Sequence, residues 1–312
     1  MKSNGVSIVV PVYNEEGNVA DLHAEILAVC QREKYDFEII FINDGSKDRT
    51  DEICKTLTPL KYVKLRRNFG QTAAMDAGIK IAKYDYIITM DGDRQNDPED
   101  IPKLISYLEE NDLDIVSGWR KNRKDTFFKK FTSRGANLLR KIFVKDGIHD
   151  SGCSLKLYKK ECFDHVNLYG EMHRFIPALL QIKGFEVGEI VVNHRPRTSG
   201  VTKYNWKRTF KGFTDMISIW FWRRYSQRPL HIFGTSGIFF ILIGLLSGLC
   251  SVFLFFNGKD MTEYIMWPLL TVFFIVIGLI MFVFGLMSDM ICKTYYGTGI
   301  DTSYSVKEVS DL

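Results

Sequence analysis

Residues 86–95 of the 312-residue chain read YIITMDGDRQ, an apolar, β-favouring run followed at once by two aspartates one residue apart. An apolar run of this length is typical of a strand that is buried on both faces of a sheet. Asp91 and Asp93 then stand directly beyond the carboxyl end of that strand. The stretch therefore predicts a buried strand that brings carboxylates to one edge of a sheet.

Similar apolar runs occur on both sides of this one, with helix-like stretches between them. The predicted strands are Val6–Val12, Phe37–Ile42, Tyr62–Leu65, Tyr86–Met90 and Asp114–Ser117. The predicted helices are Asn18–Cys30, Arg49–Leu57, Gln71–Ala82 and Pro98–Glu109. This alternation indicates an α/β fold with a mostly parallel, Rossmann-like sheet covered by helices on both faces. Ligands of such sheets bind beyond the carboxyl ends of the strands.

The C-terminal part of the chain has a different composition. Residues 229–258 and 264–288 contain no Asp, Glu, Lys or Arg. Each run exceeds the roughly 20 apolar residues that cross a bilayer. We expect a transmembrane hairpin at 229–291, with spans at about 231–256 and 264–288; two buried core helices are the alternative. Lys and Arg gather before the first span and Lys293 follows the second, which predicts that both termini are cytoplasmic.

The expected organisation is a cytoplasmic catalytic domain at 1–205, a juxtamembrane segment at 206–228, the hairpin, and a cytoplasmic tail at 292–312. The juxtamembrane segment mixes aromatic and basic residues, which suits a helix in the headgroup region or a linker helix packed on protein. Residues 127–144 have a similar mixture and the same two interpretations. The expected location is the inner, or plasma, membrane of the cell, with the chain as a multi-pass protein.

The charge, the cysteine spacing and the absence of two motifs argue against several classes of protein. The formal net charge of +4 is too small to indicate a nucleic-acid partner, and none is expected. The six cysteines have no zinc spacing and suit a reducing compartment. The chain starts on a predicted strand, so a secretory signal is not expected. Neither GxGxxG nor GxxxxGK[ST] occurs, which argues against a dinucleotide enzyme or a P-loop ATPase.

Polar residues follow the first, second and fourth predicted strands. Asp91 and Asp93 could hold Mg²⁺ or Mn²⁺, which prefer oxygen ligands and share them with substrate phosphates; a solvated acidic turn is the alternative. Asp44, after the second strand, could accept hydrogen bonds from a ribose or a base. Its DGSKD context equally suits a turn followed by a helix N-cap.

Taken together and in this order, these segments resemble the family-2 glycosyltransferases with a GT-A fold, over residues 6 to about 205. The resemblance is carried by VVPVYNEEGNV at 9–19, INDGSKDRT at 42–50 and MDGDRQNDPEDIP at 90–102. Later segments look like the polyprenyl-phosphate branch of that family: DSGC at 150–153, HRFIP at 173–177 and RTSGVTKY at 197–204. The hairpin is similar to that of two-span bacterial undecaprenyl-phosphate glucosyltransferases.

The resemblance implies roles for single residues. The nucleoside would be held by Pro11, Tyr13, Glu15 and Asp44. Asp91 would lie near the ribose and the metal, and Asp93 and Gln95 would bind the Mg²⁺ or Mn²⁺ that bridges the diphosphate. Donor and acceptor phosphates would be neutralised by Arg120, Arg134, Arg197 and Lys203; a solvated surface charge is the alternative for each. Asp150 would orient the sugar or the acceptor, or simply cap a turn. The residues expected to carry catalysis are Asp91, Asp93, Asp150, Arg197 and Lys203.

The expected reaction is inverting, metal-dependent transfer of a hexose from a nucleotide-sugar to a polyprenyl (undecaprenyl) phosphate on the cytoplasmic face of the bilayer. UDP-glucose is the donor implied by the resemblance; N-acetylhexosamines, mannose and a modified arabinose stay open. A lipid phosphate is already anionic near neutral pH, so its oxygen needs no general base. The alternatives are a processive polysaccharide synthase, whose QxxRW motif the chain lacks, and a non-catalytic nucleotide-sugar-binding protein. Association of hairpins into a homo-oligomer is left open.

Overall fold

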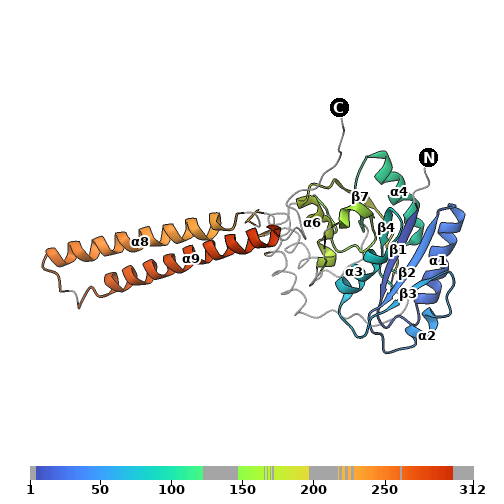
Figure 1. Cartoon of the computed structure of the whole chain (residues 1–312), viewed down its shortest axis with the longest axis horizontal. Helices are drawn as coiled ribbons and strands as arrows, with labels where there is room; N and C mark the ends of the chain where they lie inside the picture. The colour runs from blue at the N-terminus through green and yellow to red at the C-terminus, as the bar shows by residue number, and fades with distance from the viewer. Residues whose placement is uncertain are drawn as a thin grey trace. The chain divides into compact units, whose positions relative to one another are not determined.

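The computed structural model describes residues 5–121, 147–164, 172–196, 228–260 and 262–297, with single residues between some of these ranges. The chain divides into two compact units: the first comprises residues 1–219 and 304–312, and the second comprises residues 220–303 (Figure 1). The first unit contains a sheet covered by helices, and the second contains two long helices. Nearly all of 127–144 and 206–228, the two predicted basic–aromatic segments, lies outside the described residues.

Among the described residues, seven strands form one sheet with the order β3-β2-β1-β4-β6-β5-β7. Their bounds are β1 Val6–Val12, β2 Phe37–Asn43, β3 Lys61–Lys64, β4 Tyr86–Thr89, β5 Ile115–Trp119, β6 Lys156–Lys159 and β7 Val187–Val191. β1 pairs in parallel with β2 on one side and with β4 on the other. β6 is antiparallel to both of its neighbours, β4 and β5. The carboxyl ends of the other strands therefore meet at one edge, and β6 begins at that edge.

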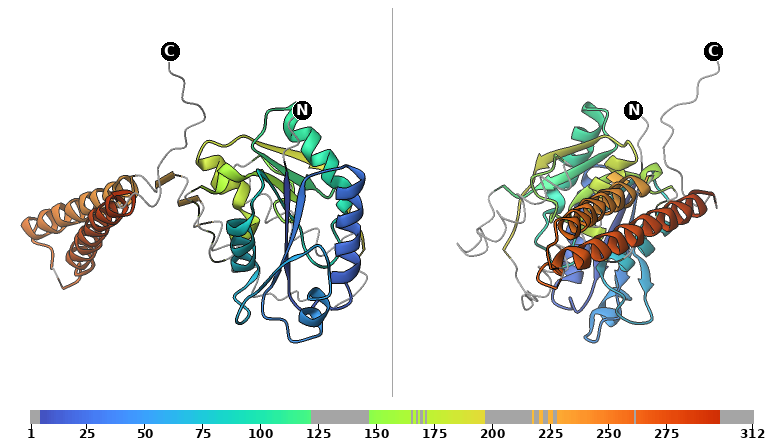
Figure 2. Two further views of the ribbon diagram at one scale, coloured as in Figure 1. Left: turned by 45° about the vertical axis from the view of Figure 1, so that its right-hand side comes forward. Right: turned by 90° about the vertical axis from the view of Figure 1, so that its left-hand side faces the viewer.

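Helices cover both faces of the sheet (Figure 2). Their bounds are α1 Val19–Arg32, α2 Thr50–Cys54, α3 Gln71–Ile81, α4 Ile101–Glu110 and α6 Ile176–Ile182, with short 3₁₀ turns η1 Pro98–Asp100, η2 Lys160–Phe163 and η3 Met172–Arg174. Side chains of successive strand residues alternate between the faces. Ile8 and Val10 of β1 pack in one core cluster with residues of α1 and α4. Val9 packs in the other cluster with residues of α3 and α6.

The five strands and four helices predicted from sequence are present, with ends shifted by a few residues. The helix predicted at Arg49–Leu57 is shorter, and the one at Pro98–Glu109 opens as the 3₁₀ turn η1. β6, β7 and α6 were not predicted. β6 begins with the charged residue Lys156, and β7 contains Gly188 and Glu189, so neither has the apolar character of a central strand.

The second unit consists of α8 Leu230–Phe256 and α9 Met266–Gly297. Both helices are long and apolar enough to cross a membrane, with mean hydropathies of 2.7 and 2.9 over their spans. Most of their large apolar side chains are exposed, which is the opposite of a water-soluble core. The helices approach closely at Gly237 and Gly278: a Cβ built on either glycine would lie 2.6 Å from the carbonyl oxygen of the other. Only glycine allows this approach.

Candidate active site

The loop after β4 carries the predicted metal ligands. Arg94 adopts φ of +61°, in the left-handed region, so the chain turns sharply between Asp93 and Gln95. The Asp93 side chain is buried, with its residue only 7% exposed, and its Oδ1 accepts a hydrogen bond from the Gln95 backbone at 3.2 Å. Arg94 itself points to α1, where it contacts Asp21 and, at 2.5 Å, Glu25. The loop is therefore anchored to α1 through the residue between the two predicted ligands.

Asp91 lies in a charged environment. Its Oδ1 accepts a hydrogen bond from Gln71 Nε2 at 2.7 Å. Burial, and then repulsion from Asp93, raise the pKa of the Asp91 carboxyl. Its backbone N–H donates to Asn96 Oδ1, which also accepts from the Ser154 hydroxyl. Asn96 was missed by sequence reasoning, and it links the loop after β4 to the residues before β6.

The donor set of Asp91, Asp93 and Gln95 fits Mg²⁺ or Mn²⁺. Two carboxylates and one amide supply hard oxygen ligands and leave a repulsion that a divalent cation relieves. In the described part of the chain, no group of three or more His, Cys, Asp or Glu residues could hold a metal. These three side chains alone would leave coordination positions open for substrate phosphates, which commonly complete the shell of Mg²⁺.

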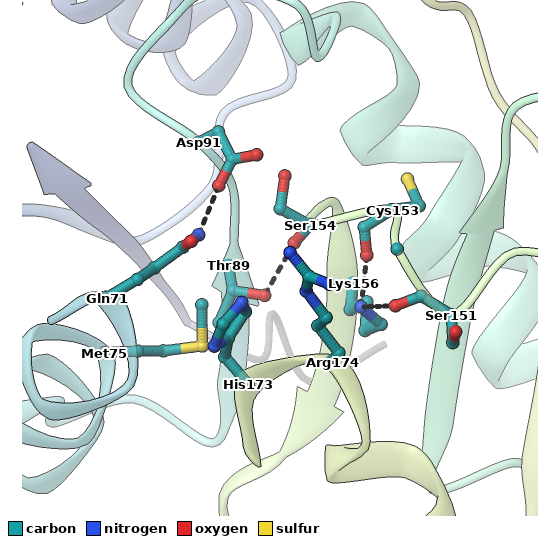
Figure 3. Close-up of a pocket in the computed structure, with 11 residues that line it drawn as sticks. Gln71, Met75, Thr89, Asp91, Ser151, Cys153, Ser154, Lys156, His173 and Arg174 are labelled. Carbon is teal, nitrogen blue, oxygen red and sulfur yellow. Dashed lines mark hydrogen bonds between the residues drawn. The ribbon is translucent and has the colours of Figure 1, made fainter. Parts of the chain in front are cut away.

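A cavity of about 110 Å³ opens beside Asp91 (Figure 3). It is lined by Gln71, Met75, Thr89, Asp91, Ser151, Gly152, Cys153, Ser154, Lys156, His173 and Arg174. The Lys156 side chain is fully buried and donates to the carbonyls of Ser151 and Cys153. Burial lowers the pKa of Lys156. His173 Nδ1 lies 2.8 Å from the Thr72 hydroxyl of α3.

Gln71, Lys156, His173 and Arg174 were not predicted as site residues. The HRFIP segment at 173–177 contributes to the family resemblance, which assigns no role to its histidine or its arginine. One feature of the sequence could have identified Lys156 as a site residue: it is a single charged residue between Leu155 and Leu157. A charged residue in a buried strand is rare unless it is paired or functional.

Arg120, which follows β5, and Asp150, which precedes the cavity-lining residues 151–154, form a buried ion pair. Arg120 Nε donates to Asp150 Oδ2 at 2.7 Å and Nη2 donates to Oδ1 at 2.9 Å, with side chains only 9% and 14% exposed. Burial opposes the charge of Arg120, but Asp150 outweighs it and the pKa of Arg120 is raised. Glu189 of β7 in turn accepts from the Asp150 backbone and from His149 Nδ1. Asp150 is thus held by a cation, which suits positioning better than proton abstraction.

The loops after β1 and β2 form the other half of this edge. The Asp44 carboxylate accepts from the backbone N–H groups of Phe69 and Gly70 at 2.7 and 2.9 Å. Asn14, whose φ is +55°, and Ser46 connect the two loops: the Asn14 N–H donates to Ser46 Oγ at 3.0 Å. The Glu15 N–H donates to Thr50 Oγ1 in the same way.

The structure therefore brings several predicted site residues to one edge of the sheet. They are Pro11, Tyr13, Glu15, Asp44, Asp91, Asp93, Gln95, Arg120 and Asp150. The predicted residues Arg134, Arg197 and Lys203 lie outside the described residues. Asn193–Arg195, which precede Arg197, do contact residues 91–97, named the metal loop here for its predicted ligands: His194 forms a β-bridge with Asn96, and the Arg195 N–H donates to the Gln95 carbonyl at 2.9 Å.

The sequence matches a known family over the part that builds this edge. Residues 7–166 match the family described as Glycosyl transferase family 2. The chain belongs to glycosyltransferase family 2.

Curated relatives of this family 2 glycosyltransferase match almost its whole length. Dodecaprenyl-phosphate galacturonate synthase of Rhizobium johnstonii is 39% identical and covers 100% of this chain and 94% of its own. Undecaprenyl-phosphate 4-deoxy-4-formamido-L-arabinose transferase of Pectobacterium atrosepticum is 32% identical, covering 97% and 93%. Both names describe polyprenyl-phosphate enzymes, which confirms the resemblance to that branch.

Solved structures confirm the GT-A fold of the family 2 glycosyltransferase. Glucosyl-3-phosphoglycerate synthase of Mycobacterium tuberculosis, in complex with Mn²⁺, uridine diphosphate and glucosyl-3-phosphoglycerate, superimposes with a TM-score of 0.56 at 14% identity, covering 70% of this chain and 80% of that one. Mannosyl-3-phosphoglycerate synthase of Rubrobacter xylanophilus gives a TM-score of 0.56 at 15% identity, covering 69% and 73%. The prediction of an α/β fold with a mostly parallel sheet is confirmed.

Proposed function

We propose that the chain transfers a sugar from a nucleotide-sugar to a polyprenyl phosphate at a membrane surface. The observation that carries the proposal is one chain that combines the Asp91–Gln95 loop at the ligand edge of a GT-A sheet with two helices of bilayer length. The names of the relatives contain dodecaprenyl phosphate and undecaprenyl phosphate, which supports a lipid phosphate as the acceptor of this chain. Undecaprenyl phosphate is the acceptor to test first.

The donor is the finer part of the proposal. UDP-glucose, expected from the resemblance, has no counterpart in the names of these relatives, which specify galacturonate and 4-deoxy-4-formamido-L-arabinose. We therefore rank a UDP-linked galacturonate first, since that relative has the higher identity over the whole chain. Arg174, which lines the cavity, suits a sugar carboxylate, a group that galacturonate has and glucose lacks. Formamido-arabinose and glucose follow.

The mechanism that we propose uses the acceptor's own charge. The lipid phosphate is anionic near neutral pH, so its oxygen can attack the anomeric carbon without a base, and direct displacement inverts that centre. The protein then has to align the reactants and stabilise the leaving diphosphate. Asp93, Gln95 and Asp91 would hold Mg²⁺ or Mn²⁺, which supplies Lewis-acid stabilisation of the diphosphate. Asp150, held by Arg120, would orient the segment 151–154 that lines the cavity.

We further propose that α8 and α9 cross the inner membrane with the catalytic unit and both termini on the cytoplasmic side. The basic residues that precede α8 and Lys293 in the last turns of α9 support this orientation. The donor and the polyprenyl phosphate headgroup would then meet on the cytoplasmic face. A cysteine placed after residue 300 should react with a membrane-impermeant thiol reagent only in inside-out vesicles.

Transfer of label into lipid tests the function. Membranes that contain the chain are given undecaprenyl phosphate, Mg²⁺ or Mn²⁺, and one labelled donor at a time: UDP-galacturonate, UDP-glucose or UDP-4-deoxy-4-formamido-L-arabinose. We expect an organic-extractable product with one sugar per lipid. Label in a polymer that stays in the aqueous phase would instead indicate a processive synthase. No product with any donor would overturn the proposal.

A further inference from the structure

A cluster of five charged side chains joins three separate parts of the first unit. Its members are Asp21 and Glu25 of α1, Arg94 and Asp97 of the metal loop, and Arg195 after β7. Arg195 Nη1 donates to Glu25 Oε2 at 2.7 Å, and Nη2 donates to Asp97 Oδ1 at 2.6 Å. One guanidinium thus bridges a helix and the loop of the predicted metal ligands. Glu25 is shared, because its other oxygen binds Arg94.

Backbone contacts hold Arg195 in register with the metal loop. Its N–H donates to the carbonyl of Gln95, and Asn96 bridges to His194. One step earlier in the chain, the Asn193 N–H donates to Asp100 Oδ2 at 2.6 Å. The segment 193–195 therefore runs alongside residues 95–100. The Arg195 side chain connects this pair of segments to α1 through Glu25.

The chemistry of this bridge requires an arginine. A guanidinium presents N–H groups in a fixed fork, so it can bind two carboxylates on different elements at once. Arg195 and its partners are partly buried, and Asp97 most of all, which limits solvent screening. Asp97 also accepts from the Glu99 N–H, so its orientation is fixed from both sides.

We infer that Arg195 is a positioning residue for the metal site: it holds the Asp93–Asp97 loop against α1 and thereby sets the geometry of Asp93 and Gln95. The inference rests on the proposed function, in which those residues hold a divalent cation. Removing a residue that hydrogen-bonds to metal ligands and orients them typically lowers metal affinity or activity by 10–100-fold. An arginine that serves stability alone would not change metal affinity.

Arg32 provides a matched control. It forms a two-fold contact with Glu99, at 2.9 and 2.6 Å, and so connects the same helix α1 with the η1 turn just after the metal loop. The side chains of Arg32 and Glu99 are both about half exposed. Glu99 contacts the metal loop only through its backbone N–H, which donates to Asp97 and is kept when Arg32 is replaced. Arg32→Gln removes one arginine from the same interface without touching the metal loop.

The test measures metal binding directly. Free Mn²⁺ is followed by electron paramagnetic resonance while the full chain in detergent, with saturating UDP, is titrated with MnCl₂. We expect Arg195→Gln to weaken Mn²⁺ binding about 10-fold or more, and Arg195→Lys to fall between Arg195→Gln and the unchanged chain because an ammonium cannot form the fork. Arg32→Gln should bind Mn²⁺ within about 2-fold of the unchanged chain. In transfer assays, Arg195→Gln should lower kcat and raise the Mn²⁺ requirement, with the KM for lipid unchanged.

Equal Mn²⁺ affinities for Arg195→Gln and the unchanged chain would overturn the inference, as would an equal loss in Arg32→Gln. If Arg195→Gln does not fold, Glu25→Gln serves in its place, since it removes the carboxylate of α1 that Arg94 and Arg195 share and leaves the Arg94–Asp21 and Arg195–Asp97 contacts intact. Full Mn²⁺ affinity in that variant would also overturn the inference. Failure of the proposed function is a separate outcome. In that case the unchanged chain makes no lipid-linked sugar, although its Mn²⁺ binding with UDP still depends on Arg195.

Discussion

The two halves of the ligand edge are built by different interactions. The loops after β1 and β2 are joined by hydrogen bonds between backbone N–H groups and uncharged or carboxylate oxygens, as at Asn14, Ser46 and Asp44. The loops beside β4 and β6 instead place ionisable side chains around a cavity, including Asp91 and Lys156. The first half is preformed by its own contacts, whereas the second half holds ionisable groups whose charges a diphosphate and a metal would balance. Substitutions in the first half should alter donor binding, and those in the second should alter the rate.

The largest effect is expected for Asp93→Asn. The change removes one charge from the predicted metal ligand and keeps its shape, so the loop should fold while metal-assisted stabilisation of the diphosphate is lost. Formation of lipid-linked sugar should fall roughly 100-fold or more, with little change in thermal unfolding. Glu52→Gln, an exposed carboxylate on α2, is the control and should stay fully active. If the activity of Asp93→Asn stays within about 2-fold of that of the unchanged chain, Asp93 is not a metal ligand, and the proposed difference between the two halves of the edge loses its metal site.

A smaller loss of activity is expected for Arg120→Gln, together with a marked loss of stability. It leaves Asp150 buried without its cation, which typically lowers the free energy of unfolding by about 3 kcal/mol or more. The double variant Arg120→Gln, Asp150→Asn should regain much of that stability because no buried charge is left unpaired. If the pair also positions the cavity, transfer should stay at least about 10-fold low in the double variant. Thermal unfolding and transfer rates, measured as a double-mutant cycle, separate the two roles.

Sequence reasoning predicted the central strands and the Asp91–Gln95 loop because both depend on local patterns. An apolar run buried on both faces identifies β4, and the polar residues after it must then lie at the ligand edge. The direction of β6 is not a local property, since it depends on how the chain returns from β5. The contact of Arg195 with Glu25 joins residues 170 positions apart and depends on β7 pairing with β5. No local pattern encodes that contact.

In the loops after β1 and β2, which the family resemblance assigns to the nucleoside, Asp44→Asn should mainly weaken donor binding. An asparagine amide group would face one of the two N–H groups of Phe69 and Gly70, so this loop would lose one of its contacts. We expect the KM for the nucleotide-sugar to rise about 10-fold, equivalent to about 1.4 kcal/mol, with a smaller change in kcat. Binding of UDP measured by calorimetry should weaken to the same extent. A change confined to kcat would contradict the division between the two halves.

The smallest effect on catalysis is expected for Asp51→Asn, a substitution in α2. Asp51 accepts from Lys64, from the Tyr62 hydroxyl and from Lys55, and these contacts lower the pKa of its carboxyl. A lowered folded-state pKa means that the stabilisation is present above the unfolded pKa of about 3.9 and is lost as the pH falls below it.

We therefore expect Asp51→Asn to unfold more easily by about 1 kcal/mol at pH 7, with the difference from the unchanged chain shrinking below pH 4. Thermal unfolding at several pH values measures this difference. Transfer activity at pH 7 should be unchanged, since the side chain of Asp51 contacts Lys55 and, on β3, Tyr62 and Lys64, which are not predicted site residues. A loss of activity without a loss of stability would show that the β2–β3 side takes a direct part in the reaction.

The reversed direction of β6 has a consequence for how enzymes of this architecture can diversify. Because β5 ends and β6 begins at the same edge, the chain leaves β5 and returns to β6 on the edge where Asp91 and Asp93 lie. A change of length between these two strands therefore alters that edge without shifting a strand register. Under the proposed function, we expect acceptor and sugar preference to diverge among relatives in this connection, while the sheet and the loop of Asp91 and Asp93 stay unaltered.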